Sequence, residues 1–151
     1  LFHALQRPRA RSAVYLVQRE VAERLVAHAD SDAYGALSVN VQALASAQLM
    51  FGVPRGAFNP PPKVDSAVVR VIPLGQPLVE PTEEQGFREF VQAAFGMRRK
   101  QLRRVLRGMK NMEPTAADSI LSDVGIDPMA RPETVSAARF AALYRRFRGA
   151  P

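Results

Sequence analysis

The hydrophobic periodicity of this 151-residue chain changes after Pro73, and this change limits the folds open to it. Before Pro73, a short run rich in β-branched and aromatic residues predicts a buried strand at 12–18, and two further strands are predicted at 46–54 and 66–73. Two segments of helix-forming composition lie between the first two strands, at 19–28 and 37–45. Because a strand that runs directly into a helix is half of a β/α unit, this part of the chain predicts an open α/β sheet.

Beyond Pro73, apolar residues recur with the 3.6-residue period of amphipathic helices. Four stripes have this spacing: Phe87, Phe90, Val91, Ala94 and Phe95; Leu102, Val105, Leu106 and Met109; Ala117, Ile120, Leu121 and Val124; and Phe140, Leu143, Tyr144 and Phe147. Gly125 has the position of a C-cap glycine, and Ser136 that of an N-cap. These features predict a small helical bundle. The predicted domains are an α/β part at 1–75, a linker at 76–83 and an all-helical domain at 84–151.

Composition excludes several kinds of site. The chain has no cysteine, so disulfides, thiolate zinc sites and cysteine nucleophiles are excluded. His3 and His28 do not have the spacing of metal ligands, and we expect no metal site. No apolar run approaches the ~20 residues of a membrane span. Leu1 stands first and no signal-peptide pattern follows it, so we expect a cytoplasmic protein of which this chain is a fragment.

Basic side chains are concentrated in residues 98–110, RRKQLRRVLRGMK. The net charge of the chain is +7, and this segment holds seven of the 21 basic residues and no acidic one. On a helical wheel, six basic residues form one arc opposite the apolar stripe: Arg99, Lys100, Arg103, Arg104, Arg107 and Lys110. Arg98 falls on the apolar side, which predicts that the preceding helix ends near Gly96.

A helical face of like charges without neighbouring carboxylates predicts a ligand that supplies the countercharge. Nucleic-acid phosphates do so, and the release of their counterions makes the affinity strongly salt-dependent. Arginine outnumbers lysine in this segment, which suits bidentate contact with phosphate. The alternatives are a merely solvated face, an acidic lipid or an acidic protein.

A second candidate site is the proline segment FNPPPKVDSAVVRV at 58–71. Prolines cannot join a sheet ladder, because they lack an N–H and their φ is fixed. They can hold Phe58 rigidly at the edge of a sheet, where its flat face could stack on a nucleobase. The alternative is a phenylalanine packed beneath a proline turn.

Six segments of the chain carry a family resemblance: VYLVQREVAERL, YGALSVNVQ, VPRGAF, AFNPPPKVDSAVVRV, FGMRRKQLRRVL and GIDPMARPETVS. In this order and spacing they resemble the ribosomal RNA adenine dimethyltransferases, the KsgA (RsmA) family, whose proline motif reads F-x-P-P-P-K-V-x-S-x-V. The resemblance runs from about residue 1 to residue 147. It implies a Rossmann-like class I methyltransferase sheet, here reduced to about three strands, followed by a helical domain.

The resemblance also implies a reaction. The family transfers methyl groups from S-adenosylmethionine to N6 of two adjacent adenines near the 3′ end of small-subunit (16S) rRNA during ribosome assembly. Phe58 would stack on the target adenine, with Pro60, Pro61 and Pro62 at the rim of the pocket and Lys63 on a phosphate. The matched basic run, Arg98, Arg99 and Lys100, would contact rRNA.

The sequence departs from the family pattern at the catalytic centre. It contains no G-x-G-x-x-G loop, no acidic residue placed for the cofactor ribose and no N-L-P-Y motif. We therefore expect this chain to bind no S-adenosylmethionine and to be catalytically incompetent alone. The alternative function is a non-enzymatic rRNA-binding or assembly module with a structural Phe58. Large-subunit resistance methyltransferases and mitochondrial transcription-factor relatives share the catalytic domain, but GIDPMARPETVS favours the small-subunit branch.

The family's sheet order implies that strand 66–73 is central and antiparallel between 12–18 and 46–54. Strand 12–18 would then expose an apolar edge, a risk for pairing with a second copy. We predict self-association through this edge. A monomer in light scattering at high concentration would contradict it.

Overall fold

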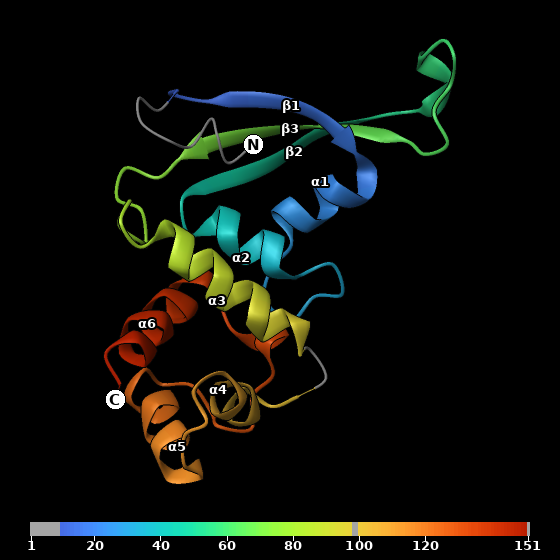
Figure 1. Cartoon of the computed structure of the whole chain (residues 1–151). Coiled ribbons are helices and arrows are strands. Elements are labelled where there is room, and N and C mark those ends of the chain that lie inside the picture. The colour runs from blue at the N-terminus through green and yellow to red at the C-terminus, as the bar shows by residue number, and fades with distance from the viewer. Residues whose placement is uncertain (1–9, 98–99, 151) are drawn as a thin grey trace.

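The computed structural model describes residues 10–97 and 100–150, and its elements follow the predicted order (Figure 1). The strands are β1 (Ala13–Gln18), β2 (Ala45–Val53) and β3 (Ser66–Pro73). The α-helices are α1 (Arg19–Val26), α2 (Ala36–Gln42), α3 (Glu84–Gly96), α4 (Leu102–Lys110), α5 (Pro114–Asp123) and α6 (Ala137–Arg148). Two 3-10 helices are η2 (Arg55–Ala57) and η3 (Pro132–Thr134). The predicted strands and helices are confirmed, with shifts of a few residues at their ends.

In the sheet, β3 lies between β1 and β2 and is antiparallel to both, which confirms the predicted strand order. The register pairs Ser66 with Gln18 on one side and with Val53 on the other. Helices α1 and α2 cover one face of the sheet (Figure 1), where Ala67, Val69 and Val71 of β3 are buried. The pairing therefore brings the end of β1, the end of β2 and the start of β3 together at one end of the sheet.

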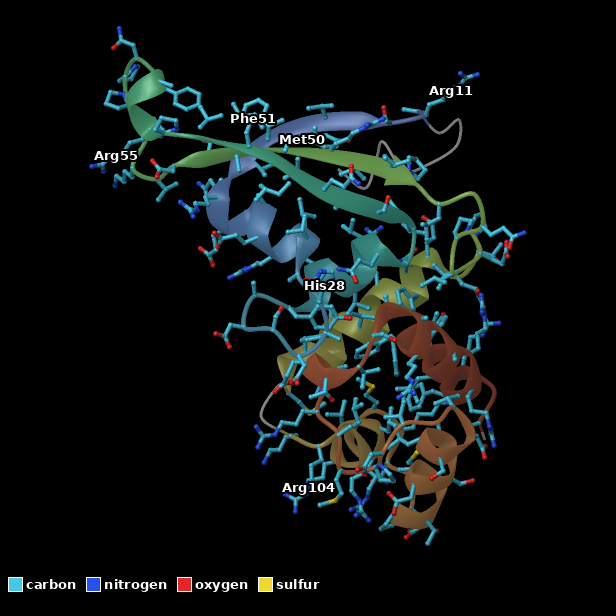
Figure 2. The ribbon with its side chains drawn as sticks, turned by 180° about the vertical axis from the view of Figure 1, so that it is seen from behind. Arg11, His28, Met50, Phe51, Arg55 and Arg104 are labelled. Carbon is cyan, nitrogen blue, oxygen red and sulfur yellow. The ribbon has the colours of Figure 1, made fainter. Side chains whose placement is uncertain are left out.

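The other face of the sheet carries exposed apolar side chains. Leu16 is 53% exposed and Phe51 is 60% exposed, and both pair with Val68 of β3. Phe51 and Met50 point away from the helices (Figure 2). Among the described residues, β1 pairs with β3 alone, so it is an edge strand. The self-association predicted from this edge stays a prediction.

Aromatic side chains fill the core of the helical part. The ring centroid of Phe90 in α3 lies 5.1 Å from that of Phe147 and 5.7 Å from that of Tyr144, both in α6. Phe95 stacks on Phe140 at 5.7 Å between centroids. All four apolar stripes predicted from the sequence are buried in this core or pack against it. The period of the apolar residues thus correctly predicts which face of each helix is buried.

The predicted helix ends are also present. Gly125 follows α5 with φ of +67°, the left-handed conformation that glycine adopts without steric cost. The Ser136 hydroxyl accepts a hydrogen bond from the Arg139 N–H at the start of α6 (3.4 Å). Helix α3 ends at Gly96, which separates it from the basic segment as predicted.

The sheet and the helices share one continuous hydrophobic core. The hydroxyl of Tyr34, just before α2, donates to the Val135 carbonyl (2.9 Å), and burial raises the pKa of Tyr34 to about 12. In the segment predicted to be a linker, 76–83, the Leu78 N–H donates to the Ala43 carbonyl (2.8 Å) and Val79 is buried. This segment therefore packs on the elements that it connects.

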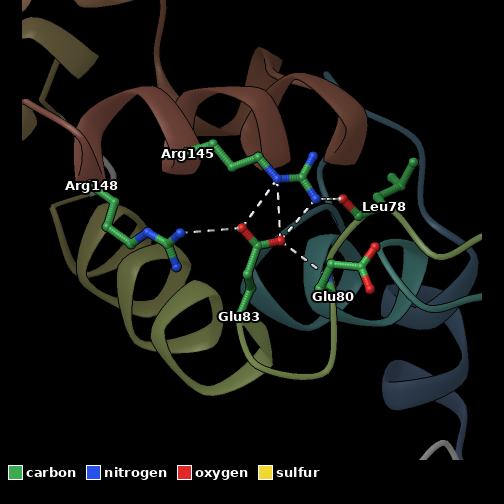
Figure 3. A network of polar contacts seen from close by, with 5 residues as sticks. All are labelled: Leu78, Glu80, Glu83, Arg145 and Arg148. Atoms are coloured by element: carbon green, nitrogen blue, oxygen red, sulfur yellow. Dashed lines mark hydrogen bonds and ion pairs between the residues drawn. The ribbon is translucent and has the colours of Figure 1, made fainter.

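Glu83, which is 6% exposed, links the start of α3 to α6 (Figure 3). Its carboxylate accepts hydrogen bonds from Nε (3.2 Å) and Nη2 (2.8 Å) of Arg145 and from the Glu80 N–H (3.0 Å). Arg145 also donates to the Leu78 carbonyl (2.9 Å). The hydrogen bond from Arg145 is the main cause that lowers the pKa of Glu83 and raises the pKa of Arg145. One arginine of α6 thus binds both the segment 76–83 and the start of α3.

Candidate nucleic-acid interface

The proline segment lies in the hairpin loop 54–65, which joins β2 to β3 and projects beyond the helices (Figure 1). η2 opens this loop, and the N–H of Phe58 donates to the Arg55 carbonyl (3.3 Å) at its end. Phe58 is partly buried, whereas the three prolines and Lys63 are exposed. The Asn59–Pro60 peptide bond is cis. The loop therefore presents the segment at one extremity of the molecule.

A cleft of about 600 Å³ lies at the base of this loop. Its lining comes from the end of β1, the start of α1 and both ends of the loop: Gln18, Arg19, Glu20, Glu23, Arg55, Lys63, Val64 and Asp65. Of the residues predicted from the proline motif, Lys63 lines the cleft, whereas Phe58 and the prolines lie outside its lining. The cleft and the aromatic side chain are thus neighbours on one loop but not one pocket.

The charges around the cleft are partly compensated. Glu23 pairs with Arg19 (3.0 Å) and Glu20 pairs with Arg24, both along the exposed surface of α1. Within the described ranges, the side chains of Arg55 and Lys63 are in no ion pair. These two cations are therefore available to an anionic ligand in the cleft.

The basic helix differs from its prediction in one respect. The sequence suggested that no carboxylate neighbours the basic arc, but Arg103 of α4 pairs with Asp118 of α5 (2.9 Å). This pair forms because α5 packs against α4 in the bundle, a contact that local spacing does not show. Lys100 and Arg104 are exposed, with Arg104 pointing into solvent (Figure 2). Arg98 and Arg99 lie outside the described residues.

The remaining cations of α4 bind the protein itself. Arg107 Nε donates to the Met112 carbonyl (3.4 Å). Lys110 Nζ donates to the carbonyls of Phe147 (3.1 Å) and Ala150 (2.6 Å) at the end of α6, where it also lies 5.1 Å from the Phe147 ring centroid. Cations at the end of a helix stabilise its free carbonyls. Lys110 therefore has a structural role, and its contact with rRNA stays a prediction.

The two predicted groups of residues form separate surfaces. Arg55, at the base of the hairpin loop, and Arg104, on α4, lie at opposite ends of the molecule (Figure 2). The structure does not bring the proline segment and the basic helix together. A single ligand that touched both would be a macromolecule.

The cleft residues Arg19, Arg55 and Asp65 are not among those that the sequence predicted. They meet because Gln18 pairs with Ser66 across β1 and β3, which places residues 19 and 65 side by side. The Arg19 N–H indeed donates to the Asp65 carbonyl (3.0 Å). No local motif carries this information, since the contact depends on strand order and register.

In the described sheet, β1 passes directly through Gln18 and Arg19 into α1. The described part of the chain holds no group of three or more His, Cys, Asp or Glu residues suited to a metal ion. Among its helices, none is long and apolar enough to cross a membrane.

Comparison with known proteins places the chain in a family. The family described as Ribosomal RNA adenine dimethylase matches residues 1–148. The chain belongs to this family. A relative from Janthinobacterium sp. (strain Marseille), named Ribosomal RNA small subunit methyltransferase A, is 46% identical over 147 residues, which are 97% of this chain and 54% of that protein. A protein of the same name from Acinetobacter baylyi is 41% identical and covers 95% of this chain and 50% of its own.

Solved structures confirm the fold of this chain. A dimethyladenosine transferase from Plasmodium falciparum has a TM-score of 0.78 at 23% identity. The match covers 95% of this chain and 60% of the Plasmodium chain. The 23S rRNA methyltransferase ErmE has a TM-score of 0.63 at 23% identity, over 96% of this chain and 58% of its own. The chain therefore has the fold of the C-terminal part of a Rossmann-like methyltransferase, and it spans about half the length of the curated relatives that it matches.

Proposed function

We propose that the chain is part of an S-adenosylmethionine-dependent rRNA adenine-N6 dimethyltransferase. Its target would be two adjacent adenines near the 3′ end of small-subunit rRNA, in the cytoplasm, during ribosome assembly. The observation that carries this proposal is the family match over residues 1–148, whose motif FNPPPKV occupies an exposed hairpin loop. The names of the relatives, which include the words small subunit, support the choice of rRNA.

In this proposal the two surfaces have different tasks. Arg104 on α4 and Lys100 just before that helix, with the neighbouring Arg98 and Arg99, bind rRNA phosphates. Phe58 stacks on the target adenine, Pro60, Pro61 and Pro62 form the rim around it, and Lys63 contacts a flanking phosphate. Arg103, Arg107 and Lys110 contribute positive potential, although each also has a partner within the protein. The separation of the surfaces suits a large folded RNA.

We further propose that this chain binds rRNA but does not transfer a methyl group alone. The residues that would hold the cofactor and orient the exocyclic amine are absent from its sequence. When bound to the whole enzyme, S-adenosylmethionine supplies the methyl group. The residues of this chain contribute binding and orientation of the RNA.

The test is binding of the chain to purified small ribosomal subunits that lack these methyl groups, with large subunits as control, followed by an assay with radiolabelled S-adenosylmethionine. We expect at least about tenfold tighter binding to small than to large subunits, which is less than the usual ratio between specific and non-specific affinity. We expect no transfer of label. Equal binding to both subunits would contradict the assignment. Incorporation of label would contradict the proposed inactivity.

A second candidate is a non-enzymatic rRNA-binding module. The position of Phe58 and the prolines outside the lining of the cleft favours it. In that case Phe58 contacts no adenine, and Phe58→Ala would leave the affinity for small subunits unchanged.

A further inference from the structure

Asp65 lies where three parts of the chain meet. Its backbone carbonyl accepts a hydrogen bond from the N–H of Arg19 (3.0 Å), the first residue of α1. Its side-chain Oδ1 accepts a hydrogen bond from the N–H of Arg55 (2.9 Å), the first residue of η2. Asp65 itself directly precedes β3. One partly buried residue therefore ties the hairpin loop to the start of α1 and to the start of η2.

Hydrogen bonds within η2 connect Arg55, which Asp65 binds, to Phe58. The N–H of Ala57 donates to the Pro54 carbonyl (2.9 Å), and the N–H of Phe58 donates to the Arg55 carbonyl (3.3 Å). Pro54 precedes η2 and provides no side-chain cap. Instead, the carboxylate of Asp65, ten residues after Arg55, accepts the hydrogen bond from the first N–H of η2. Since a hydrogen bond from an N–H to a carboxylate is stronger than one to a neutral acceptor, Asp65 fixes the turn that ends at Phe58.

The loop has few other attachments. In the described part of the chain, the bond between Arg55 and Asp65 is the one side-chain hydrogen bond made by residues 54–65. The ladder between β2 and β3 ends with the pair of Val53 and Ser66. The position of the loop beyond that pair therefore depends on Asp65 to an unusual degree.

We propose that Asp65 is a positioning residue that holds Phe58 in the orientation needed to stack on a nucleobase. This role rests on the proposed function, because it requires that Phe58 contacts a base. Asp65 does not touch the base in this proposal. It acts through the backbone of η2.

The first test measures hydrogen exchange in the free chain. Asp65→Ala is expected to increase the exchange rate of the Arg55 and Phe58 amides by roughly tenfold or more, the loss expected for one charge-assisted hydrogen bond. Asp65→Asn, which keeps an oxygen acceptor, is expected to restore most of the protection. Asp127→Ala is the matched control, because Oδ1 of Asp127 accepts from the Met129 N–H (2.8 Å) in a turn of the helical part.

The second test measures stacking. The chain has no tryptophan, so Phe58→Trp introduces a single indole fluorophore at the proposed contact. An RNA hairpin with two adjacent unpaired adenines is expected to quench the indole fluorescence of this variant. Addition of Asp65→Ala is expected to reduce that quenching at least twofold at saturation while the dissociation constant changes less than about twofold, since phosphates dominate affinity. Asp65→Asn is expected to restore the quenching.

The outcomes separate the two proposals. Unchanged exchange of the Arg55 and Phe58 amides in Asp65→Ala would overturn the positioning role, whatever the RNA does. Equal quenching with and without Asp65→Ala would overturn it as well. Absence of quenching in the parent Phe58→Trp chain would instead refute the stacking role of Phe58, and the exchange rates would still decide whether Asp65 holds the loop.

Discussion

Replacement of Lys100 and Arg104 by glutamate is expected to weaken binding of the chain to unmethylated small ribosomal subunits by about a hundredfold at ~0.1 M salt. Both side chains are exposed. Each lost phosphate contact is also expected to reduce the slope of log K against log salt concentration by roughly one. The measurement is a salt titration of the parent chain and the variant. A second variant, with Arg98, Arg99 and Lys100 changed to glutamate, tests the segment that matches the family motif.

The control must change the net charge equally without touching α4. Arg11→Glu with Arg70→Glu does so, because both residues are exposed and belong to the sheet part of the chain. This variant is expected to lose far less affinity and to keep most of the salt slope. Equal losses in the two double variants would show that net charge alone drives binding. Arg103→Glu is unsuitable as a probe, since it also removes the ion pair with Asp118.

The helical part was predictable from the sequence because its signals are local. The apolar stripes, the left-handed Gly125 and the Ser136 cap each depend on residues within one or two turns of helix. The same locality led to the error at Arg103. A helical wheel shows the neighbours of a residue on its own helix, whereas Asp118 reaches Arg103 from another helix through tertiary packing.

The candidate site was predictable only where a motif marked it. The segment around Phe58 could be located from its prolines, and the sheet order from the family resemblance. The cleft could not, since its walls come from residues 18–23 and 55–65, which the pairing of β1 with β3 brings together. The role of Asp65 likewise depends on the backbone N–H of Arg55. Because every residue except proline has this group, the residue type at position 55 does not reveal the contact.

Arg145→Ala is expected to lower the free energy of unfolding by about 3 kcal/mol at neutral pH. The effect is asymmetric within the pair. Arg145 is 47% exposed on its side chain, so loss of its partner leaves a cation that water can solvate. Glu83 is 8% exposed on its side chain, and without Arg145 its charge stays buried, with Arg148 3.8 Å away and the Glu80 N–H as remaining partners. Glu83→Gln is therefore expected to cost less than Arg145→Ala.

The pH dependence of the destabilisation caused by Arg145→Ala identifies its cause. In the parent chain the folded-state pKa of Glu83 lies below its ordinary value of 4.5, so the pair contributes its full stability above pH 4.5 and loses it as pH falls through the folded-state pKa. The difference in free energy of unfolding between the parent and Arg145→Ala should thus be largest near neutral pH and should disappear in acid. Urea unfolding at several pH values measures it. Arg146→Ala is the matched control on the same helix, because its pair with Asp123 is exposed on both sides and is worth at most about 1 kcal/mol. A difference that stayed constant with pH would show that Arg145 stabilises the fold through packing and its bond to the Leu78 carbonyl, and not through the charge of Glu83.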